Sequence, residues 1–368
     1  MVFFRNRKKK FFILLSLLSF IMLFCGYSEN KSEASTYTDE EINSSMEQLF
    51  QRKAKAILTV DMEVLQGIYD RNTKFGNWAC QYEERKIKYL HNWEVKQGIK
   101  FLDISPKIII RRKYIKGDRC SLNLVCSTLY KYSYEDQPDV INECRIGTYH
   151  NMTVENREGS WIVTKEWYND PFADSLSINN LKVESMKQFI LSQVGRDIST
   201  IVDRRKSAKD YAQKYCGSAS EEQYGYKYNK KYVDFNPKGG DCANFASQIL
   251  FEGGKFRKNS NWNYALGEGT RSWVNADGFK GYMVNSGRAS VIAYGSYEKV
   301  LKASFKLLPG DFVGYEKKGD ITHISVVTGA DSKGYALVTC HNTDRNNVPW
   351  DLGWSDKTLK FYLVRVHF

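Results

Sequence analysis

The sequence predicts an α+β protein with two folded domains behind a short apolar segment at its N-terminus. Its 368 residues are too many for one typical domain and suit two. In the first half, apolar residues at helical spacing precede long runs of alternating apolar and polar residues, which is the order of an α+β domain. In the second half, two predicted helices and a long irregular segment precede short antiparallel strands. We therefore expect domains at 37–172 and 201–368, joined by a linker at 173–200.

Residues 1–35 have the character of a targeting segment. The basic stretch RNRKKK precedes the apolar run FFILLSLLSFIMLF at 11–24. This run is shorter than the roughly 20 residues that cross a membrane, and it fits the core of a signal peptide. We expect a signal peptide or an uncleaved anchor, and a protein that is secreted or held at the cell surface. Cys25 stands where a lipid-modified cysteine would, but the bulky Phe24 before it is unfavourable, so cleavage, lipidation and retention all stay open.

The first domain is predicted to hold two long helices and four long strands. The helices are expected at 38–70 and at about 77–97, where apolar residues keep helical spacing. The strands follow, with turns predicted at Gly117-Asp118, Gln137-Pro138-Asp139 and Glu158-Gly159.

This pattern resembles the NTF2-like or cystatin-like cone, in which a curved sheet wraps around a helix. The resemblance covers about 37–170 and rests on the order of the elements, with no specific motif. It implies a binding or spacing role. His91 and His150 are isolated histidines, which we expect on the surface or satisfied within the core.

The second domain is predicted to begin with a helix and to end with antiparallel strands. A connector at 171–200 has one helix in its second half. The next helix carries Ala208, Tyr211, Ala212 and Tyr215 on one face and ends at Gly217. Later strands are expected within GDFVGYE, THISVVTG, YALVTCH and LKFYLVRVHF.

The stretch GGDCANFASQILFEGG at 239–254 places a cysteine at the start of a helix. Asp241 is a good N-cap, and Gly253-Gly254 supply a stop. Cys242 therefore falls in the first turn, where free N–H groups and the helix dipole stabilise a thiolate. The pattern predicts a nucleophile. A buried structural cysteine is the alternative that position alone leaves open.

A nucleophilic thiol needs a base, and the second domain offers histidines on two strands. His323 lies in GDITHISVVTG, where alternation puts it on one face with Ile321, Ser325 and Val327. His341 ends the next strand. A third polar group there would hold the His323 ring in the right tautomer.

Asn342 and Asp344 follow His341 closely enough to be rivals for that third role, and His367 carries little weight at the chain end. Asp241 and Asn244 flank the nucleophile, and we interpret them as supporting residues.

The segments YAQKYC, DCANFASQILFEGG, PGDFVGYE, ITHISVVTG and CHNTD resemble the "putative amidase domain" family, whose fold is related to the papain-like NlpC/P60 and CHAP peptidoglycan hydrolases. The resemblance covers about 204–366, and the block Asp-Cys-x-Asn-Phe-x-Ser-Gln is its specific part. It implies a cysteine amidase or endopeptidase with Cys242 as nucleophile, His323 as base and His341 as third member. It does not settle the substrate.

The charge and the cysteine spacing limit the classes of partner, metal and cofactor that we expect for this chain. The net charge is +12, and 201–368 carry 25 Lys and Arg against 17 Asp and Glu. A basic exported domain suits an anionic cell wall. Arginine-rich runs and nucleic-acid motifs are missing, so we expect no nucleic acid. CxxC and HExxH spacings are missing too, so we expect no metal and no cofactor. Cys126 and Cys144, on adjacent predicted strands, are candidates for a disulfide.

The sequence as a whole predicts an exported cysteine hydrolase acting on amide or peptide bonds, with peptidoglycan as the expected substrate. Two alternatives use the same chain. The first is an acyl transferase that passes the thioester to an amine, and the second is a non-catalytic wall-binding or spore-associated protein. We expect Cys242 to alkylate faster than the other cysteines near neutral pH.

Overall fold

The computed structural model describes residues 37–172, 176, 182–355 and 357–368. The predicted signal or anchor segment at 1–35, Cys25 included, lies outside these residues. Among the helices of the described ranges, none is both long enough and apolar enough to cross a membrane.

Three helices open the described chain: α2 (Asp39–Thr59), α3 (Met62–Ile68) and α4 (Lys74–Gln97). Thr38 and Glu41 form a capping box at the start of α2. The expected single helix over 38–70 is wrong, because Val60 takes a left-handed conformation with φ of 58° and Asp61 caps α3 with its side chain. The second predicted helix is confirmed as α4, which begins three residues earlier than expected.

The four predicted strands are confirmed as β1 (Ile99–Lys116), β2 (Arg119–Tyr134), β3 (Gln137–Arg157) and β4 (Ser160–Tyr168). They form an antiparallel meander. Two of the predicted turns are in place. The turn predicted at Gln137-Pro138-Asp139 is wrong. Tyr134 at the end of β2 pairs directly with Gln137, so the turn is Glu135-Asp136 and Pro138 lies inside β3.

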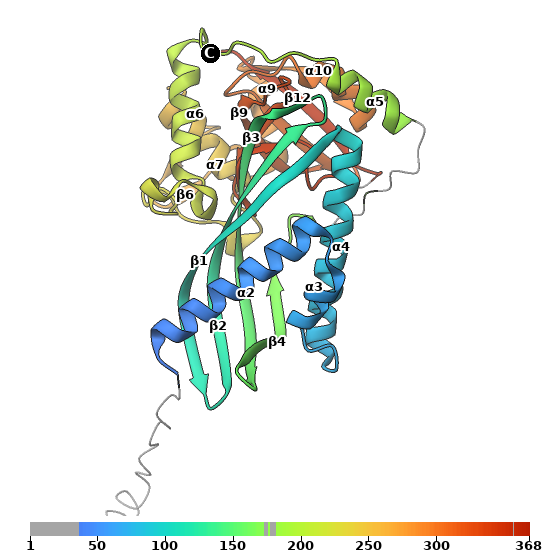
Figure 1. Ribbon diagram of the computed structural model, residues 1–368. Helices are drawn as coiled ribbons and strands as arrows, with labels where there is room; N and C mark the ends of the chain where they lie inside the picture. Colours follow the sequence, from blue (N-terminus) through green and yellow to red (C-terminus); the bar gives the residue numbers. More distant parts are fainter. Residues whose placement is uncertain (1–36, 173–175, 177–181, 356) are drawn as a thin grey trace, which may run out of the picture.

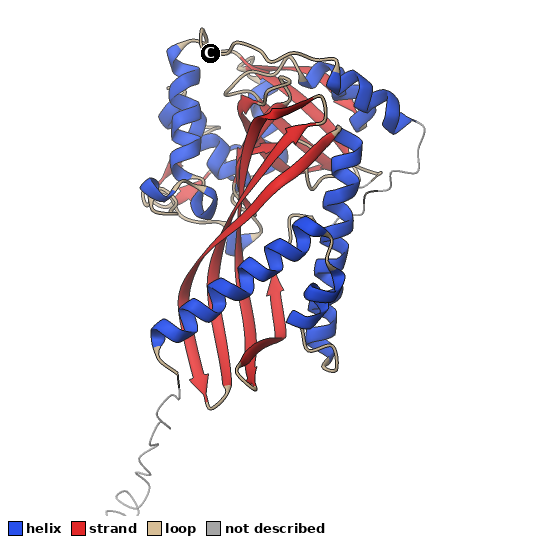
Figure 2. Ribbon diagram, viewed as in Figure 1, coloured by secondary structure: helices blue, strands red, loops and turns tan. Residues whose placement is uncertain are grey.

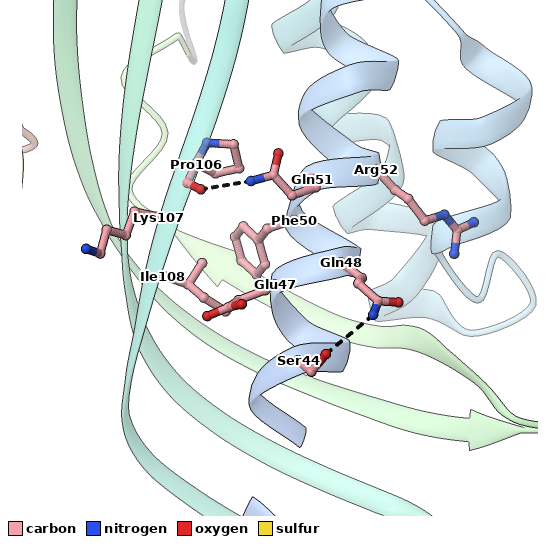
Figure 3. A pocket seen from close by; sticks show the side chains of 9 residues that line it. All are labelled: Ser44, Glu47, Gln48, Phe50, Gln51, Arg52, Pro106, Lys107 and Ile108. Carbon is pink, nitrogen blue, oxygen red and sulfur yellow. Dashed lines mark hydrogen bonds between the residues drawn. The ribbon is translucent and has the colours of Figure 1, made fainter. Parts of the chain in front are cut away.

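The helices of this half pack on one side of the curved meander (Figure 1). Between them lies a buried ionic cluster in which the Lys53 ammonium contacts Glu83 at 2.9 Å and Glu166 at 2.9 Å. The His150 ring joins this cluster through Glu166, so His150 is a satisfied core residue, as expected. A groove of about 690 Å³ opens between α2 and β1, beside Phe50 (Figure 3). The helices and the antiparallel sheet confirm that this half is α+β.

The second half alternates helices with short strands. The predicted connector helix is present as α5 (Lys182–Leu191). The helices that follow are α6 (Asp203–Tyr215), α7 (Cys242–Gln248), α8 (Arg271–Val274), α9 (Ala276–Asn285) and α10 (Tyr297–Ser304). The strands are the small hairpin β5 (Tyr264–Ala265) and β6 (Glu268–Gly269), and β7 (Ala289–Gly295), β8 (Phe312–Lys317), β9 (Asp320–Ala330), β10 (Ala336–Cys340), β11 (Asp344–Pro349) and β12 (Lys360–Val366).

One continuous sheet runs through both halves (Figure 2). In the described ranges it has ten strands in the order β1-β2-β3-β11-β10-β9-β8-β12-β7, with β4 also pairing with β3. The long strand β3 is the joint. Its C-terminal part pairs with β4, and its residues 145–147 pair with 344–346 of β11. The site described below lies close to this joint, because β10 and β11 are neighbours.

A buried carboxylate also ties α4 to the second half. Asp351 accepts hydrogen bonds from the Trp93 indole at 3.1 Å, from the Lys96 ammonium and from the Tyr335 hydroxyl at 2.7 Å. Burial of the ammonium lowers the pKa of Lys96, although the Asp351 charge opposes this. The two halves are therefore held by a charge pair as well as by the sheet.

Candidate active site

Cys242 is the first residue of α7, as predicted. Gly239 and Gly240 have φ of 109° and 136°, which ends the preceding short helical turn and leads the chain into α7. The helix is brief. It continues into a π-helical turn at Ile249–Gly253, and Gly254 follows as its C-cap. The predicted stop at the two glycines is therefore confirmed.

The Cys242 thiol is buried, with 5% of the residue exposed. Burial raises the pKa of Cys242 to about 12, while backbone hydrogen bonds from Ile324 and Ala243 work in the opposite direction. The prediction of a thiolate is therefore wrong, because desolvation of the buried sulfur raises its pKa by more than the backbone groups at the helix start lower it. The seven cysteines of the described ranges are free, so the suggested Cys126–Cys144 disulfide is absent among them.

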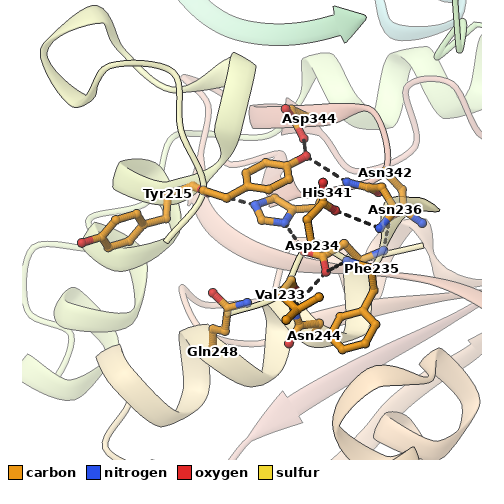
Figure 4. Close-up of polar contacts among 12 residues, drawn as sticks. Tyr215, Val233, Asp234, Phe235, Asn236, Asn244, Gln248, His341, Asn342 and Asp344 are labelled. Carbon is orange, nitrogen blue, oxygen red and sulfur yellow. Dashed lines mark hydrogen bonds and ion pairs between the residues drawn. The ribbon is translucent and has the colours of Figure 1, made fainter. Parts of the chain in front are cut away.

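Asp241 accepts three hydrogen bonds at the start of α7. Its carboxylate receives the Phe235 backbone N–H at 2.9 Å and the Asn244 amide at 2.8 Å, and it lies 2.5 Å from the His341 ring. Its side chain makes no capping bond to α7, so the expected cap is wrong and the carboxylate binds the histidine instead. Asn244 also donates to the Val233 carbonyl, which is the supporting role predicted for it. Figure 4 shows polar contacts around His341, Asn244 and Phe235.

His341 uses both ring nitrogens. Nδ1 faces Asp241, and Nε2 donates to the Tyr215 carbonyl at 2.9 Å. Both partners are acceptors, so the ring carries two protons and a positive charge in this arrangement. Burial alone would lower the pKa of His341, but the hydrogen bond and charge of Asp241 outweigh it and hold the pKa above the ordinary value. The rings of Phe245 and Tyr228 stack on its two faces, with centroids at 3.6 and 3.8 Å.

His323 lies on the other face of the sheet from Cys242. The neighbouring Ile324 packs with Cys242 in one core, and alternation along β9 turns His323 away from it. The His323 ring lies beside Tyr315 and Trp354, and its Nε2 is 3.2 Å from the Ser325 hydroxyl.

Burial, followed by the charge of Arg345, lowers the pKa of His323 to about 3. The structure therefore does not bring Cys242 and His323, the expected nucleophile and base, together. His341 binds Asp241 and Tyr215, and it does not orient the His323 ring. The base role of His323 stays a prediction from the resemblance.

Asn342 and Asp344 serve different parts of the site. The Asn342 side chain accepts the backbone N–H of Asp241, and both Asn342 and Thr343 have left-handed φ, of 67° and 71°. Asp344 is buried and accepts from the Ser218 backbone N–H at 2.7 Å and from the Tyr228 hydroxyl at 2.6 Å. Neither side chain contacts His323, so neither is its orienting group.

A pocket of about 750 Å³ lies against this network. Gly239, Gly240 and Asn342 line it from the second half of the chain, and Tyr149 and Trp167 line it from β3 and β4. Gly240 allows a close approach here, because a Cβ at this position would lie 2.3 Å from the Asn342 side-chain nitrogen. A substrate in the pocket would therefore meet the backbone immediately before Cys242.

Sequence reasoning missed several residues that build the site. The Tyr215 carbonyl and the Phe235 N–H carry no sequence signal, since any residue supplies them. Tyr228 carries no motif that distinguishes it from the other tyrosines before Cys242, and the structure singles it out by its stacking on His341. The Trp273 indole carries no such signal either; it is fully buried and donates to the Asn244 side-chain oxygen at 2.9 Å, so it supports Asn244 from the core.

Residues 202–364 match a family model described as "Putative amidase domain". The matched region is somewhat less than half of the chain and holds the whole network around Asp241 and His341. It is thus similar to domains named for hydrolysis of amides. It contains Cys242, but the match itself does not test cysteine chemistry.

Two curated relatives from Bacillus subtilis (strain 168) match as well. "Uncharacterized protein YhbB" is 28% identical over 161 residues, which are 40% of this chain and 46% of the relative. "Uncharacterized protein YjcM" is 29% identical over 170 residues, 44% of this chain and 38% of the relative. The chain thus spans less than half the length of these relatives.

Solved structures align with about a third of the chain. The intermembrane space region of chloroplast protein ARC6 covers 34% of this chain and 95% of its own, with 11% identity and a TM-score of 0.24. A "Putative Scytalone Dehydratase" from Novosphingobium aromaticivorans covers 34% and 80%, with 11% identity and a TM-score of 0.25. TM-scores this low support no statement about class or activity, so the NTF2-like and papain-like assignments stay predictions.

Proposed function

We propose that residues 202–364 are a cysteine-dependent amidase that cleaves amide or peptide bonds in peptidoglycan. The observation that carries the proposal is the position of Cys242. It begins α7 beside the pocket at Gly239-Gly240, and backbone groups of Ala243 and Ile324 bond its sulfur. Such bonds favour the anionic form of the sulfur, which is the nucleophile. Export through residues 1–35 and the basic charge of this half belong to the same proposal.

We assign the base to His341, oriented by Asp241, because His341 and Cys242 pack on the same side of the sheet with Phe245. The charged ring donates from Nε2 to the Tyr215 carbonyl. Once the ring loses that proton, a lone pair faces the carbonyl oxygen, the contact becomes repulsive, and Nε2 is able to accept a proton. The ring stays tied to Asp241 through Nδ1–H.

The reaction then balances in two stages. The Cys242 sulfur attacks the amide carbonyl while its proton passes to Nε2 of His341, and that proton leaves with the departing amine. Water next attacks the thioester, which releases the acid and restores the thiol. Because the neutral ring is the base, activity should rise with pH through the raised pKa of His341.

The test is release of muropeptides from purified cell walls, followed by mass spectrometry. We expect Cys242→Ala and His341→Asn to abolish release and His323→Asn to retain it. Release by Cys242→Ala would end the proposal. If His323→Asn abolished release while His341→Asn kept it, the base would be His323, as the resemblance implies. Products joined to an added amine would identify an acyl transferase instead.

A further inference from the structure

A row of exposed aromatic side chains leads away from the site pocket across the first half of the chain. Trp167 on β4 is 55% exposed, and Phe75 and Trp78 on α4 are 55% and 40% exposed. Trp167 lines the site pocket and also a second pocket of about 660 Å³, which Phe75 and Trp78 line as well. The two pockets share this wall, and we call them together the aromatic groove.

The core does not require these aromatic side chains. On β4, Glu166 and Tyr168 point inward and are buried, so alternation turns Trp167 outward, where it lies opposite Asn151 of β3. On α4, Trp78 stands beside the buried Ala79 and faces outward, with its ring 5.0 Å from that of Tyr82. Exposed aromatic surface gathered in a hollow is a mark of a binding site.

The polar lining of the second pocket is free to bind. Among the described residues, the amide side chains of Asn77, Gln81 and Asn151 have no hydrogen-bond partner, although all three line this pocket. Two exposed lysines, Lys74 and Lys165, line it too.

The acidic residue of this lining is already neutralised. Glu166 contacts the Lys53 ammonium at 2.9 Å and the His150 ring at 2.7 Å, and it is buried. The accessible charge of the pocket is therefore positive, and it complements a carboxylated ligand.

Hydrogen bonds connect the strands that carry the aromatic groove to the segment that follows His341. Asn169, just after β4, donates to the Thr343 hydroxyl at 3.1 Å, and the Tyr149 hydroxyl donates to Asp344 at 3.3 Å. Both acceptors lie within three residues of His341. A long ligand on Trp167 would therefore extend to Gly240, two residues before Cys242.

We propose that the aromatic groove binds the glycan strand of the substrate, a β-1,4-linked chain of N-acetylated amino sugars whose stem peptides carry carboxylates. This inference rests on the proposed function and adds how the chain presents its substrate. The C–H face of a sugar packs on an aromatic ring, and its hydroxyl and acetamido groups pair with the free amides. Carboxylates of the stem peptides pair with Lys74 and Lys165. The peptide stem then reaches the pocket at Gly240.

The test measures binding without turnover, on the full chain carrying Cys242→Ala. The probes are the hexasaccharide of N-acetylglucosamine, followed by calorimetry, and purified insoluble peptidoglycan, followed by co-sedimentation. We expect Trp167→Ala and Trp78→Ala each to weaken binding about tenfold. Tyr114→Ala is the matched control, because Tyr114 is 69% exposed on β1 and lines neither pocket of the groove; its binding should be unchanged.

Unchanged binding by both tryptophan variants would overturn the proposal. So would tighter binding of oligothymidylate than of the hexasaccharide, lost in the same variants, because bases also stack on aromatic rings. Failure here is distinct from failure of the proposed function. Muropeptide release by Cys242→Ala refutes the amidase and leaves these binding results standing, whereas a null result with the tryptophans refutes the groove alone.

Discussion

The substitution Asp241→Asn isolates the charge of the buried pair that Asp241 forms with His341. Asparagine keeps the oxygen that accepts from Phe235 and Asn244. Its amide is able to donate to Nδ1 of a neutral His341 ring whose proton stays on Nε2, bonded to the Tyr215 carbonyl. No hydrogen bond is lost, but a charge-assisted one becomes neutral. A charge-assisted hydrogen bond stabilises a fold by about 1 kcal/mol more than a neutral one. The free energy of unfolding of Asp241→Asn should therefore be lower by that amount.

The pH dependence of this loss follows from the raised pKa of His341. Stability from a group whose pKa is higher in the folded state is fully present below the unfolded pKa, about 6.5, and is lost as pH rises through the folded pKa. The deficit of Asp241→Asn should therefore be largest near pH 6 and should shrink toward pH 9.

Urea unfolding at the two pH values measures the effect, and Asp234→Asn, in the exposed loop before α7, is the matched control. Asp241→Ala should cost more, about 3–5 kcal/mol, because it leaves the charged His341 ring buried without its partner. An equal deficit of Asp241→Asn at both pH values would refute the reasoning. So would a deficit as large as that of Asp241→Ala.

Three further outcomes follow from other contacts. Cys242 should alkylate with iodoacetamide more slowly at pH 7 than a free cysteine, because burial raises its pKa to about 12; a rate equal to that of free cysteine would contradict this burial. Gly240→Ala should lower the free energy of unfolding by about 1–3 kcal/mol and should lower activity. A Cβ at Gly239 would meet no atom within 4 Å, so Gly239→Ala should lower the free energy of unfolding less, as measured by chemical denaturation. Asp351→Ala should lower stability by about 3–5 kcal/mol in thermal unfolding, because Lys96 is left buried and unpaired; a loss below 1 kcal/mol would contradict it.

The strands that alternate apolar and polar residues could be predicted from the sequence, and β11 could not. Its sequence, DRNNVP, is mostly polar, yet its residues are mostly buried, because Asp344 and Arg345 find polar partners inside the fold. Its pairing with β3 joins residues about 200 positions apart, and no local pattern records that. The continuous sheet was therefore out of reach of sequence reasoning.

The nucleophile helix was predictable for a local reason, and the histidine partners were not. Glycine, aspartate and spacing around Cys242 signal a helix start wherever they occur. Alternation placed His323 and Ser325 on one face of β9, but it gave no sign of which face meets α7. It also placed Ile321 on that face, and this was wrong, because a bulge opposite Tyr315 and Glu316 shifts the register and turns Ile321 toward the core around Ile324.

The joint between β3 and β11 limits how this protein can be divided. A fragment that begins at residue 201 would lack β3, the partner of β11. The backbone amide and carbonyl groups along that edge of β11 would then be unpaired. Exposed edge strands pair with strands of other molecules, so such a fragment should self-associate. The first half, cut at 172, would have an equally bare stretch of β3 at 145–147. For this chain, the smallest unit without an open strand edge at this joint contains both halves.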